Sequence, residues 1–243
     1  MARTTAGART TAGARTVATT RTFISTTIPY ATVALSYSPV GLWMLNNTPN
    51  DTSGFGSNGV TTNVTATTDQ LGNANSAYSF NGTNSGVKVT TNSIINISAP
   101  ISVNGWFYSG SISNYQPVVS KNNVGLTVGW EMANSSGAFR ATLRGSTLDV
   151  GAGSITLNTW NMITFTYDGT TLILYGNGSK QGNANASSTI ASSNDLQIGN
   201  RPAGNFLNGS IDGVALYNSV LTANQIKNLY NSGLGSLSRV LVP

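Results

Sequence analysis

The sequence predicts an all-β protein, a two-sheet antiparallel sandwich with one short C-terminal helix and an extended N-terminal arm. Three observations lead to this prediction. From about residue 38 the chain reads as many short segments, rich in β-branched and aromatic residues and separated by Gly, Asn and Asp. Residues 222–233 carry clear helix signals. Residues 1–22 are a low-complexity stretch of Arg, Thr, Ala and Gly, with too few apolar residues to form a core.

The N-terminal arm is basic and regular. Arginine recurs at every sixth position, at Arg3, Arg9, Arg15 and Arg21, and residues 1–22 contain no Asp or Glu. An extended chain would place these four side chains on one side, roughly 20 Å apart at ~3.3 Å per residue. We expect an arm that becomes ordered against other subunits, through the planar fork of each guanidinium group. A disordered leader and a nucleic-acid-binding tail are the alternatives, and the sparse, regular spacing disfavours the second.

The sandwich is expected over residues 38–233, and its clearest hairpin is "TYDGTTLILYGNG". Asp168-Gly169 is a turn signal, and the alternation that follows places Leu172 and Leu174 on the same face of a strand. Many short strands with turns of this kind are typical of antiparallel sandwiches.

The helix has signals at both ends. Thr222 is a good N-cap, and Gln225 three residues later completes a capping box. Leu221 and Ile226 are placed to form a hydrophobic staple, and Gly233 ends the helix. We expect its apolar stripe to pack on the sandwich.

These elements divide the chain into an arm and linker (1–37), the sandwich (38–233) and a C-terminal extension (234–243). The extension is apolar, so we expect it to pair with a sheet edge or with a neighbouring subunit. Charged residues make up only 8% of the chain, against roughly 25% in an average soluble protein. Removing the four arm arginines from 12 basic and 7 acidic residues leaves 8 against 7, so the body is nearly neutral.

Several phrases of the sequence resemble the laminin-G-like, concanavalin A-like jelly rolls, in the branch found in bacterial and phage proteins. "GLWMLNN" resembles the first strand of that family, "AYSFNGTNSGVKV" its phrase F-D-G-x-x-D-Y-V, and "ISVNGWFYSG" its strand F-T-I-x-x-W-V/F. "WNMITFTYDGTTLILYGNG" and "FLNGSIDGVALYNSVLTANQIKNLY" match two further phrases closely. The resemblance covers residues 39–230 and implies a jelly-roll topology for the sandwich.

The sequence departs from the family at positions that often carry acidic residues. Those positions read Asn46, Asn47, Asn81 and Gly213. Because Ca²⁺ prefers several carboxylate oxygens among six to eight ligands, we expect no cofactor and no tight calcium site. A weak site built on Asp168 or on Asp212 with backbone carbonyls remains the alternative to ordinary turn chemistry.

Composition argues against an enzyme. The chain has no His and no Cys, which removes the Ser-His-Asp triad and thiolate or imidazole metal sites. The glucanase relatives implied by the resemblance use a carboxylate pair on one strand. Here Glu131 is the only Glu, and no acidic residue lies within four positions of it. We therefore predict no catalytic residues.

Sugar binding is the remaining chemistry that the resemblance implies. Lectins of this fold use Asn, Gly backbone and an aromatic platform, and Tyr115 and Trp130 are our candidate carbohydrate-binding residues. For Trp130 a place in the core is the alternative. Trp43, Trp106 and Trp160 stand in strand phrases of the family and are expected in the core.

Together these observations favour a non-enzymatic structural protein of a virus or phage particle, a decoration or fibre protein on the virion surface. Its arm would contact other virion subunits or copies of the same chain, and its jelly roll would be displayed, with glycans as candidate ligands. Nucleic acid is disfavoured as a partner, and we expect no membrane partner. The alternative is a secreted or cell-surface carbohydrate-binding adhesin. The start of the chain lacks the apolar segment of a secretory signal, which favours the first reading.

Overall fold

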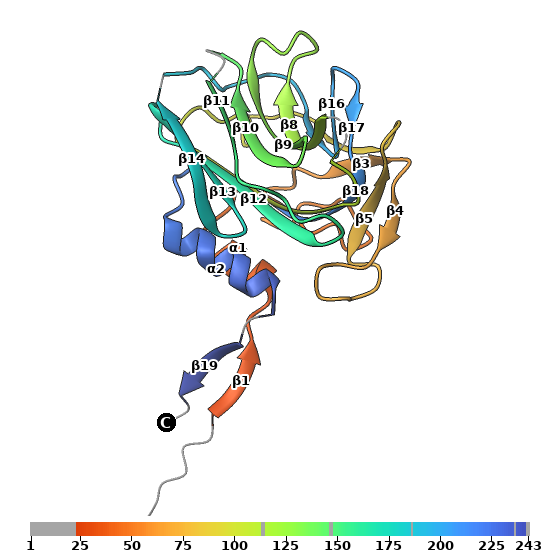
Figure 1. The fold of residues 1–243 in the computed structure, drawn as a ribbon, viewed down its shortest axis with the longest axis vertical. Helices are drawn as coiled ribbons and strands as arrows, with labels where there is room; N and C mark the ends of the chain where they lie inside the picture. The colour runs from red at the N-terminus through yellow and green to blue at the C-terminus, as the bar shows by residue number, and fades with distance from the viewer. Residues whose placement is uncertain (1–22, 113–114, 146–147, 186, 236, 242–243) are drawn as a thin grey trace, which may run out of the picture.

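The fold was analysed in a computed structural model, which describes residues 23–112, 115–145, 148–185, 187–235 and 237–241. Two antiparallel sheets face each other, two helices lie beneath one of them, and a separate two-stranded ribbon projects below the helices (Figure 1). The predicted all-β sandwich is confirmed.

The first layer is a seven-stranded sheet whose neighbouring strands are antiparallel. Its strands, in spatial order, are β11 (Leu148–Ala152), β10 (Ala138–Leu143), β9 (Gly129–Ser135), β8 (Tyr115–Asn122), β15 (Leu196–Ile198), β6 (Gly86–Val89) and β3 (Gly59–Thr62). A short hairpin packs beside β8 and consists of β16 (Asn200–Arg201) and β17 (Asn205–Phe206).

The second layer is an eight-stranded antiparallel sheet. Seven of its strands follow one path, in the order β14 (Ser179–Asn185), β13 (Thr171–Gly176), β12 (Trp160–Tyr167), β7 (Ile101–Ser109), β18 (Asn208–Tyr217), β5 (Ala77–Asn81) and β4 (Thr65–Thr67). The eighth strand, β2 (Gly41–Trp43), pairs with residues 214–216 of β18, which follow the residues of β18 that pair with β5.

The main core lies between the two sheets and follows the alternation of the strands. In the predicted hairpin, Tyr167 pairs with Leu172 across the Asp168-Gly169 turn. Leu172 and Leu174 point into this core, while alternate residues of β13 point to the opposite face. The hairpin prediction is therefore confirmed.

The C-terminal helix, α2 (Ala223–Gly233), begins with the predicted capping box. The Thr222 hydroxyl accepts a hydrogen bond from the Gln225 backbone N–H at 3.2 Å, and the Gln225 side chain accepts one from the Thr222 N–H at 2.8 Å. Leu221 and Ile226 are both buried, as the predicted staple requires. The helix packs on the outer face of the eight-stranded sheet, where Tyr230 stacks on Trp106 with ring centroids 5.5 Å apart.

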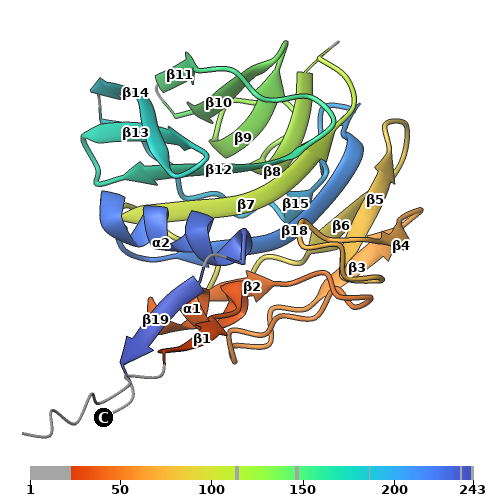
Figure 2. The same ribbon diagram turned by 60° about the horizontal axis from the view of Figure 1, so that its bottom comes forward.

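A second helix, α1 (Tyr30–Ser36), lies within residues that we assigned to the arm and linker. Tyr30 and Ala34 are buried in the same cluster as α2, and the two helices lie side by side (Figure 2). The predicted boundary at residue 38 is therefore wrong, because the folded body begins at α1. Helix signals were weak here, since the segment "YATVALS" contains Thr and Val, which have low helix propensity.

The strands nearest the termini pair with each other rather than with the sandwich. Strand β1 (Phe23–Thr27) and strand β19 (Leu237–Leu241) form an antiparallel ribbon in which Phe23 is opposite Leu241. The C-terminal extension was expected to pair with a sheet edge or a neighbouring subunit, and in the structure its strand β19 pairs with β1 of the same chain instead of with an edge of the sandwich. Arg3, Arg9, Arg15 and Arg21 lie outside the described residues. Neither of the two helices described is long and apolar enough to cross a membrane.

Candidate functional site

The two sheets differ in what covers their outer faces. Both helices cover the outer face of the eight-stranded sheet, where they bury Trp106, Met162 and Tyr217. The outer face of the seven-stranded sheet lies on the opposite side of the molecule (Figures 1 and 2). Within the described part of the chain neither helix covers it, and only the β16–β17 hairpin packs across its middle. We call this helix-free side the open face of the sandwich, although the side chains at its centre, Ser120, Glu131 and Thr142, are at most 1% exposed.

A row of side chains crosses the open face from one edge of the sheet to the other. Its members are paired strand by strand, and all but the first are polar: Val60, Lys88, Gln197, Ser120, Glu131, Thr142 and Asp149. A polar row on a sheet face follows from alternation, because the intervening residues of the same strands point into the core. The row separates into a charged part around Glu131 and a groove at one edge, which is lined by Lys88 and by uncharged residues.

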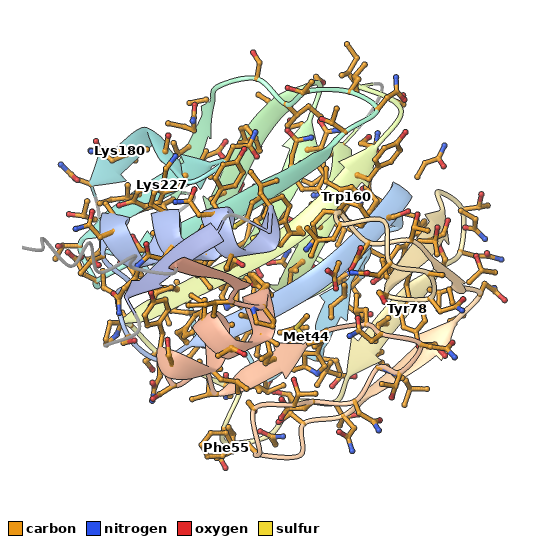
Figure 3. The ribbon with its side chains drawn as sticks, turned by 90° about the horizontal axis from the view of Figure 1, so that it is seen from below. Met44, Phe55, Tyr78, Trp160, Lys180 and Lys227 are labelled. Atoms are coloured by element: carbon orange, nitrogen blue, oxygen red, sulfur yellow. The ribbon has the colours of Figure 1, made fainter. Side chains whose placement is uncertain are left out.

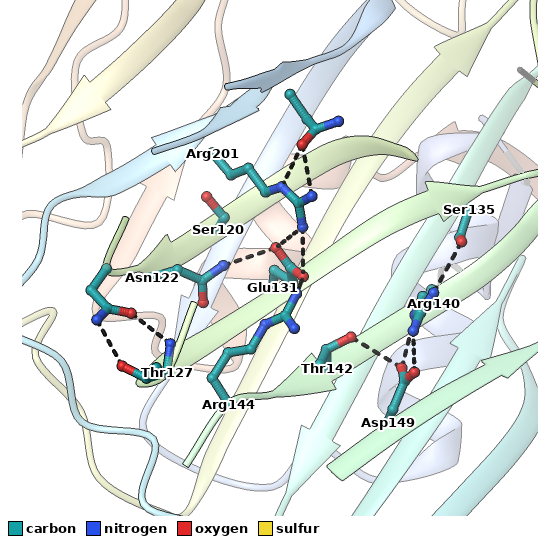
Figure 4. A network of polar contacts seen from close by, with 12 residues as sticks. Ser120, Asn122, Thr127, Glu131, Ser135, Arg140, Thr142, Arg144, Asp149 and Arg201 are labelled. Atoms are coloured by element: carbon teal, nitrogen blue, oxygen red, sulfur yellow. Dashed lines mark hydrogen bonds and ion pairs between the residues drawn. The ribbon is translucent and has the colours of Figure 1, made fainter. Parts of the chain in front are cut away.

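Glu131 is the centre of the charged part (Figure 4). Its side chain is fully buried and forms an ion pair with Arg144. Arg201 reaches the same carboxylate from the β16–β17 hairpin at 3.4 Å, and the Asn122 amide donates to it at 2.8 Å. Two arginines and an amide thus satisfy a carboxylate that would be very costly to bury alone.

Tyr115 lies beside this network. The guanidinium of Arg201 sits 4.3 Å from the centre of its ring, and that of Arg140 sits 5.7 Å away. Burial raises the pKa of the Tyr115 phenol, and the nearby Arg201, Arg144 and Arg140 partly oppose that rise. Arg140 itself is ion-paired with Asp149.

The two candidate sugar-binding aromatics therefore have different environments. Trp130 is 1% exposed and packs edge-on against Phe165 in the main core, with ring centroids 5.6 Å apart. It cannot act as a platform in this fold, so that expectation is wrong and its core alternative holds. Tyr115 is half-buried with an arginine over its ring, and its sugar-binding role stays a prediction. Trp43 and Trp106 are buried as predicted, whereas Trp160 is only half-buried, edge-on to Tyr108.

A groove of about 320 Å³ opens on the same sheet face at the edge formed by β15, β6 and β3. Its lining consists of three amide side chains, one hydroxyl, one amine, one glycine and one exposed aliphatic side chain: Val60, Thr62, Asn84, Gly86, Lys88, Gln197 and Asn200. Gly86 leaves room for the Asn200 amide, because a Cβ at Gly86 would come within 2.7 Å of its nitrogen. The Asn200 side-chain oxygen has no hydrogen-bond donor among the described residues. That oxygen is itself buried, so the polar groups that the groove presents are the side chains of Thr62, Asn84, Lys88 and Gln197.

The carboxylates of the open face are too far apart for a retaining glycosidase. Glu131 and Asp149 are two strands apart in the row, about 10 Å at ~4.8 Å per strand. A retaining glycosidase needs its two carboxyl groups about 5 Å apart. Both carboxylates here are also engaged in ion pairs with arginines.

The acidic residues considered for calcium have structural roles. Asp168 accepts hydrogen bonds from the backbone N–H groups of Thr170 (2.8 Å) and Thr171 (2.7 Å). These bonds, that from Thr171 above all, lower the pKa of its carboxyl group. Asp212 is 2% exposed, and its burial raises the pKa to about 8. No group of three or more His, Cys, Asp or Glu side chains in the described ranges is placed to bind a metal ion. The absence of a tight calcium site stays a prediction.

Sequence reasoning missed the arginine network and the groove. Alternation in "GWEMANS" places Glu131 on the face opposite Trp130, which was a usable signal. The partners Arg144 and Arg201 could not be found in this way, because register and the β16–β17 hairpin bring them to Glu131.

Comparison with solved structures shows the same fold in carbohydrate-related and toxin domains. Domain 4 of AbnA, an extracellular GH43 arabinanase from Geobacillus stearothermophilus, solved with arabinotriose, is similar with a TM-score of 0.67 and 16% identity. That match covers 79% of this chain and 98% of the arabinanase domain. The binding domain of Paraclostridial Mosquitocidal Protein 1 is similar with a TM-score of 0.66 and 20% identity.

A botulinum neurotoxin type C structure, described as interacting with two ganglioside molecules, is similar with a TM-score of 0.66 and 18% identity. The matches cover 82% of this chain but only 53% of the mosquitocidal domain and 52% of the neurotoxin chain, so our protein spans about half their length. A search of curated proteins found no match. The profile of the concanavalin A-like lectin/glucanases superfamily matches residues 80–227. Because this match covers more than half of the sequence, the chain belongs to the concanavalin A-like lectin/glucanase superfamily.

Proposed function

We propose that this chain is a glycan-binding module without enzymatic activity, which binds an oligosaccharide in the groove formed by β15, β6 and β3. The observation that carries the proposal is the groove itself, a cavity of about 320 Å³ on the open face of a lectin-like jelly roll. Its volume lies at the lower end of the ~300–1,000 Å³ that is typical of ligand pockets.

The lining of the groove suits sugar hydroxyls. Each hydroxyl is both a donor and an acceptor, and an amide side chain offers both kinds of group. Gln197 and Thr62 make no side-chain hydrogen bond to another described residue, so both side chains are available to a ligand. Val60 is 62% exposed and supplies an apolar surface for the C–H groups of a sugar ring.

The known similarities agree with this class of ligand without identifying it. The arabinanase domain was solved with arabinotriose, and the type C neurotoxin structure is described with gangliosides. Their identities of 16% and 18% show only a shared fold, so the glycan must be found by experiment.

The second part of the proposal is attachment to a particle. The excess positive charge of the chain lies in residues 1–22, with four arginines and no acidic residue. The first described strand, β1, belongs to the β1–β19 ribbon, which projects on the side opposite the seven-stranded sheet (Figure 1). An arm that docks at this end leaves the groove facing outward. We propose a surface component of a virus or phage particle on this basis, and a cell-surface adhesin is the alternative.

A glycan array with variants of the full chain tests the binding proposal. We expect the wild type to bind one class of oligosaccharide, and the double substitution Thr62→Ala with Gln197→Ala to weaken that binding. Thr61→Ala is the matched control, because this exposed neighbour on β3 does not line the groove. Equal binding by the double variant, or turnover of the bound glycan, contradicts the proposal.

A further inference from the structure

A second pocket, of about 390 Å³, lies where helix α1 leads into β2, on a different part of the surface from the groove. Its lining combines an aromatic ring and aliphatic groups with uncharged polar groups: Leu35, Ser38, Pro39, Val40, Ser53, Phe55 and Asn218. We infer that this pocket binds one ring of a neutral sugar, with its apolar face against Phe55 and its hydroxyls toward the Ser and Asn side chains.

Two of the nine large apolar side chains that are exposed in the described part of the chain line this one pocket. Phe55 is 55% exposed and Leu35 is 44% exposed, and both line the same pocket. Figure 3 shows Phe55 at the edge of the molecule, away from the core. Single exposed apolar residues are common on proteins, but a cluster around a cavity marks a binding surface.

The loop that carries Phe55 is fixed in place by Asp51. Its carboxylate accepts hydrogen bonds from the backbone N–H groups of Leu42 (2.9 Å), Ser53 (2.8 Å) and Ser57 (3.0 Å). The indole N–H of the buried Trp43 donates to the Ser57 carbonyl at 2.8 Å. The ring of Phe55 is thus presented on an ordered loop, which lowers the entropy that binding would otherwise cost.

The polar part of the pocket is uncharged and available. No charged side chain is among its lining residues, which disfavours an acidic or basic ligand. The side chains of Ser38 and Asn218 make no hydrogen bond to another described residue. An aromatic surface combined with free hydroxyl and amide groups matches a ligand that is apolar on one face and hydroxylated at its edge.

Ser38 follows the C-cap of α1 in a left-handed conformation, with φ of 55°. Glycine is the residue that usually occupies this position, because it has no Cβ to strain. The substitution Ser38→Gly therefore removes the hydroxyl without harming the fold, which separates a binding role from a structural one.

The test is an NMR titration of the full chain with methyl glycosides of glucose, galactose, mannose and xylose. We expect at least one to shift amide signals of residues 53–56. Phe55→Ala and Phe55→Leu should each weaken binding by about tenfold, while Phe55→Trp keeps it, because an aromatic face is required. Ser38→Gly should weaken binding without lowering the melting temperature, and Val124→Ala, at another exposed apolar residue, should change nothing.

Full binding by Phe55→Leu, or shifts that spare this loop, would overturn the inference. Dimerisation of the wild type that Phe55→Ala abolishes, without any sugar shift, would also overturn it and identify the pocket as a contact between copies. The site is separate from the groove, so the variant with Thr62→Ala and Gln197→Ala should bind here normally. Failure of one proposal is therefore distinguishable from failure of the other.

Discussion

The phenol of Tyr30, in helix α1, lies 2.5 Å from the side-chain oxygen of Asn104 in the middle of β7. It also lies 2.7 Å from the backbone carbonyl of Gly213 in β18. Both contacts are buried, and the Asn104 amide in turn donates to Thr164. Tyr30 therefore connects helix α1 by hydrogen bonds to β7 and β18, two central strands of the eight-stranded sheet.

We expect Tyr30→Phe to lower the free energy of unfolding by about 1–3 kcal/mol. The substitution keeps the ring but removes the single phenol proton that the Asn104 oxygen and the Gly213 carbonyl share in a buried site. Chemical denaturation measures the change, and Tyr37→Phe, at a half-buried tyrosine of the same segment, is the control. Equal stability of the two variants would show that the buried phenol of Tyr30 contributes no more than that of Tyr37, which accepts one exposed hydrogen bond from Asn228.

Deletion of residues 2–22 should leave the melting temperature nearly unchanged, because the buried contacts of α1 begin at Tyr30. Deletion of residues 2–36 should lower it clearly, since Tyr30 and Ala34 are removed from their cluster. If the shorter deletion is also incorporated normally into a particle, the anchoring role proposed for the arm is wrong.

Glu131→Gln should destabilise the fold by about 3–5 kcal/mol, because it leaves two largely buried arginines without their carboxylate. Asp149→Asn is the matched control, since this pair with Arg140 is about a third exposed and should contribute about 0–1 kcal/mol. Urea denaturation of both variants measures these two changes in the free energy of unfolding. A loss of glycosidase activity on Glu131→Gln would instead reveal an enzyme.

Asp212→Asn should stabilise the protein at pH 9 relative to the wild type. Burial raises the folded-state pKa of Asp212 to about 8, with Asp69 adding to the rise. The unfolded chain therefore releases this proton at lower pH, so the contribution of Asp212 is largest at acidic pH and is lost as pH rises through about 8. The stability difference between variant and wild type should grow from pH 5 to pH 9. A difference independent of pH would contradict the assignment.

Chelation of calcium should change the melting temperature little. A site with a dissociation constant one hundredth of the ambient calcium concentration would add about 2.7 kcal/mol, which a thermal scan detects readily. A fall of about ten degrees in EDTA, corresponding to a few kcal/mol for a chain of this size, would show that a site exists.

The parts of the structure that were predictable are those that depend on local chemistry. The capping box at Thr222 and Gln225 and the turn at Asp168-Gly169 depend on neighbouring residues, and both were found where expected. Helix α1 was missed because its stability comes from Tyr30 packing against distant strands rather than from local propensity. The Arg201–Glu131 contact joins positions 70 residues apart, and only the strand order brings them together.

The central claim is that the groove on the open face binds an oligosaccharide. Calorimetric titration with the glycan selected on the array tests it most directly. The variant Thr62→Trp places a large side chain in the groove, and Thr61→Trp is the control, because Thr61 is exposed on the same strand but does not line the groove. We predict that the wild type and Thr61→Trp bind with equal affinity, while Thr62→Trp loses at least about tenfold. Unchanged affinity of Thr62→Trp would contradict the claim.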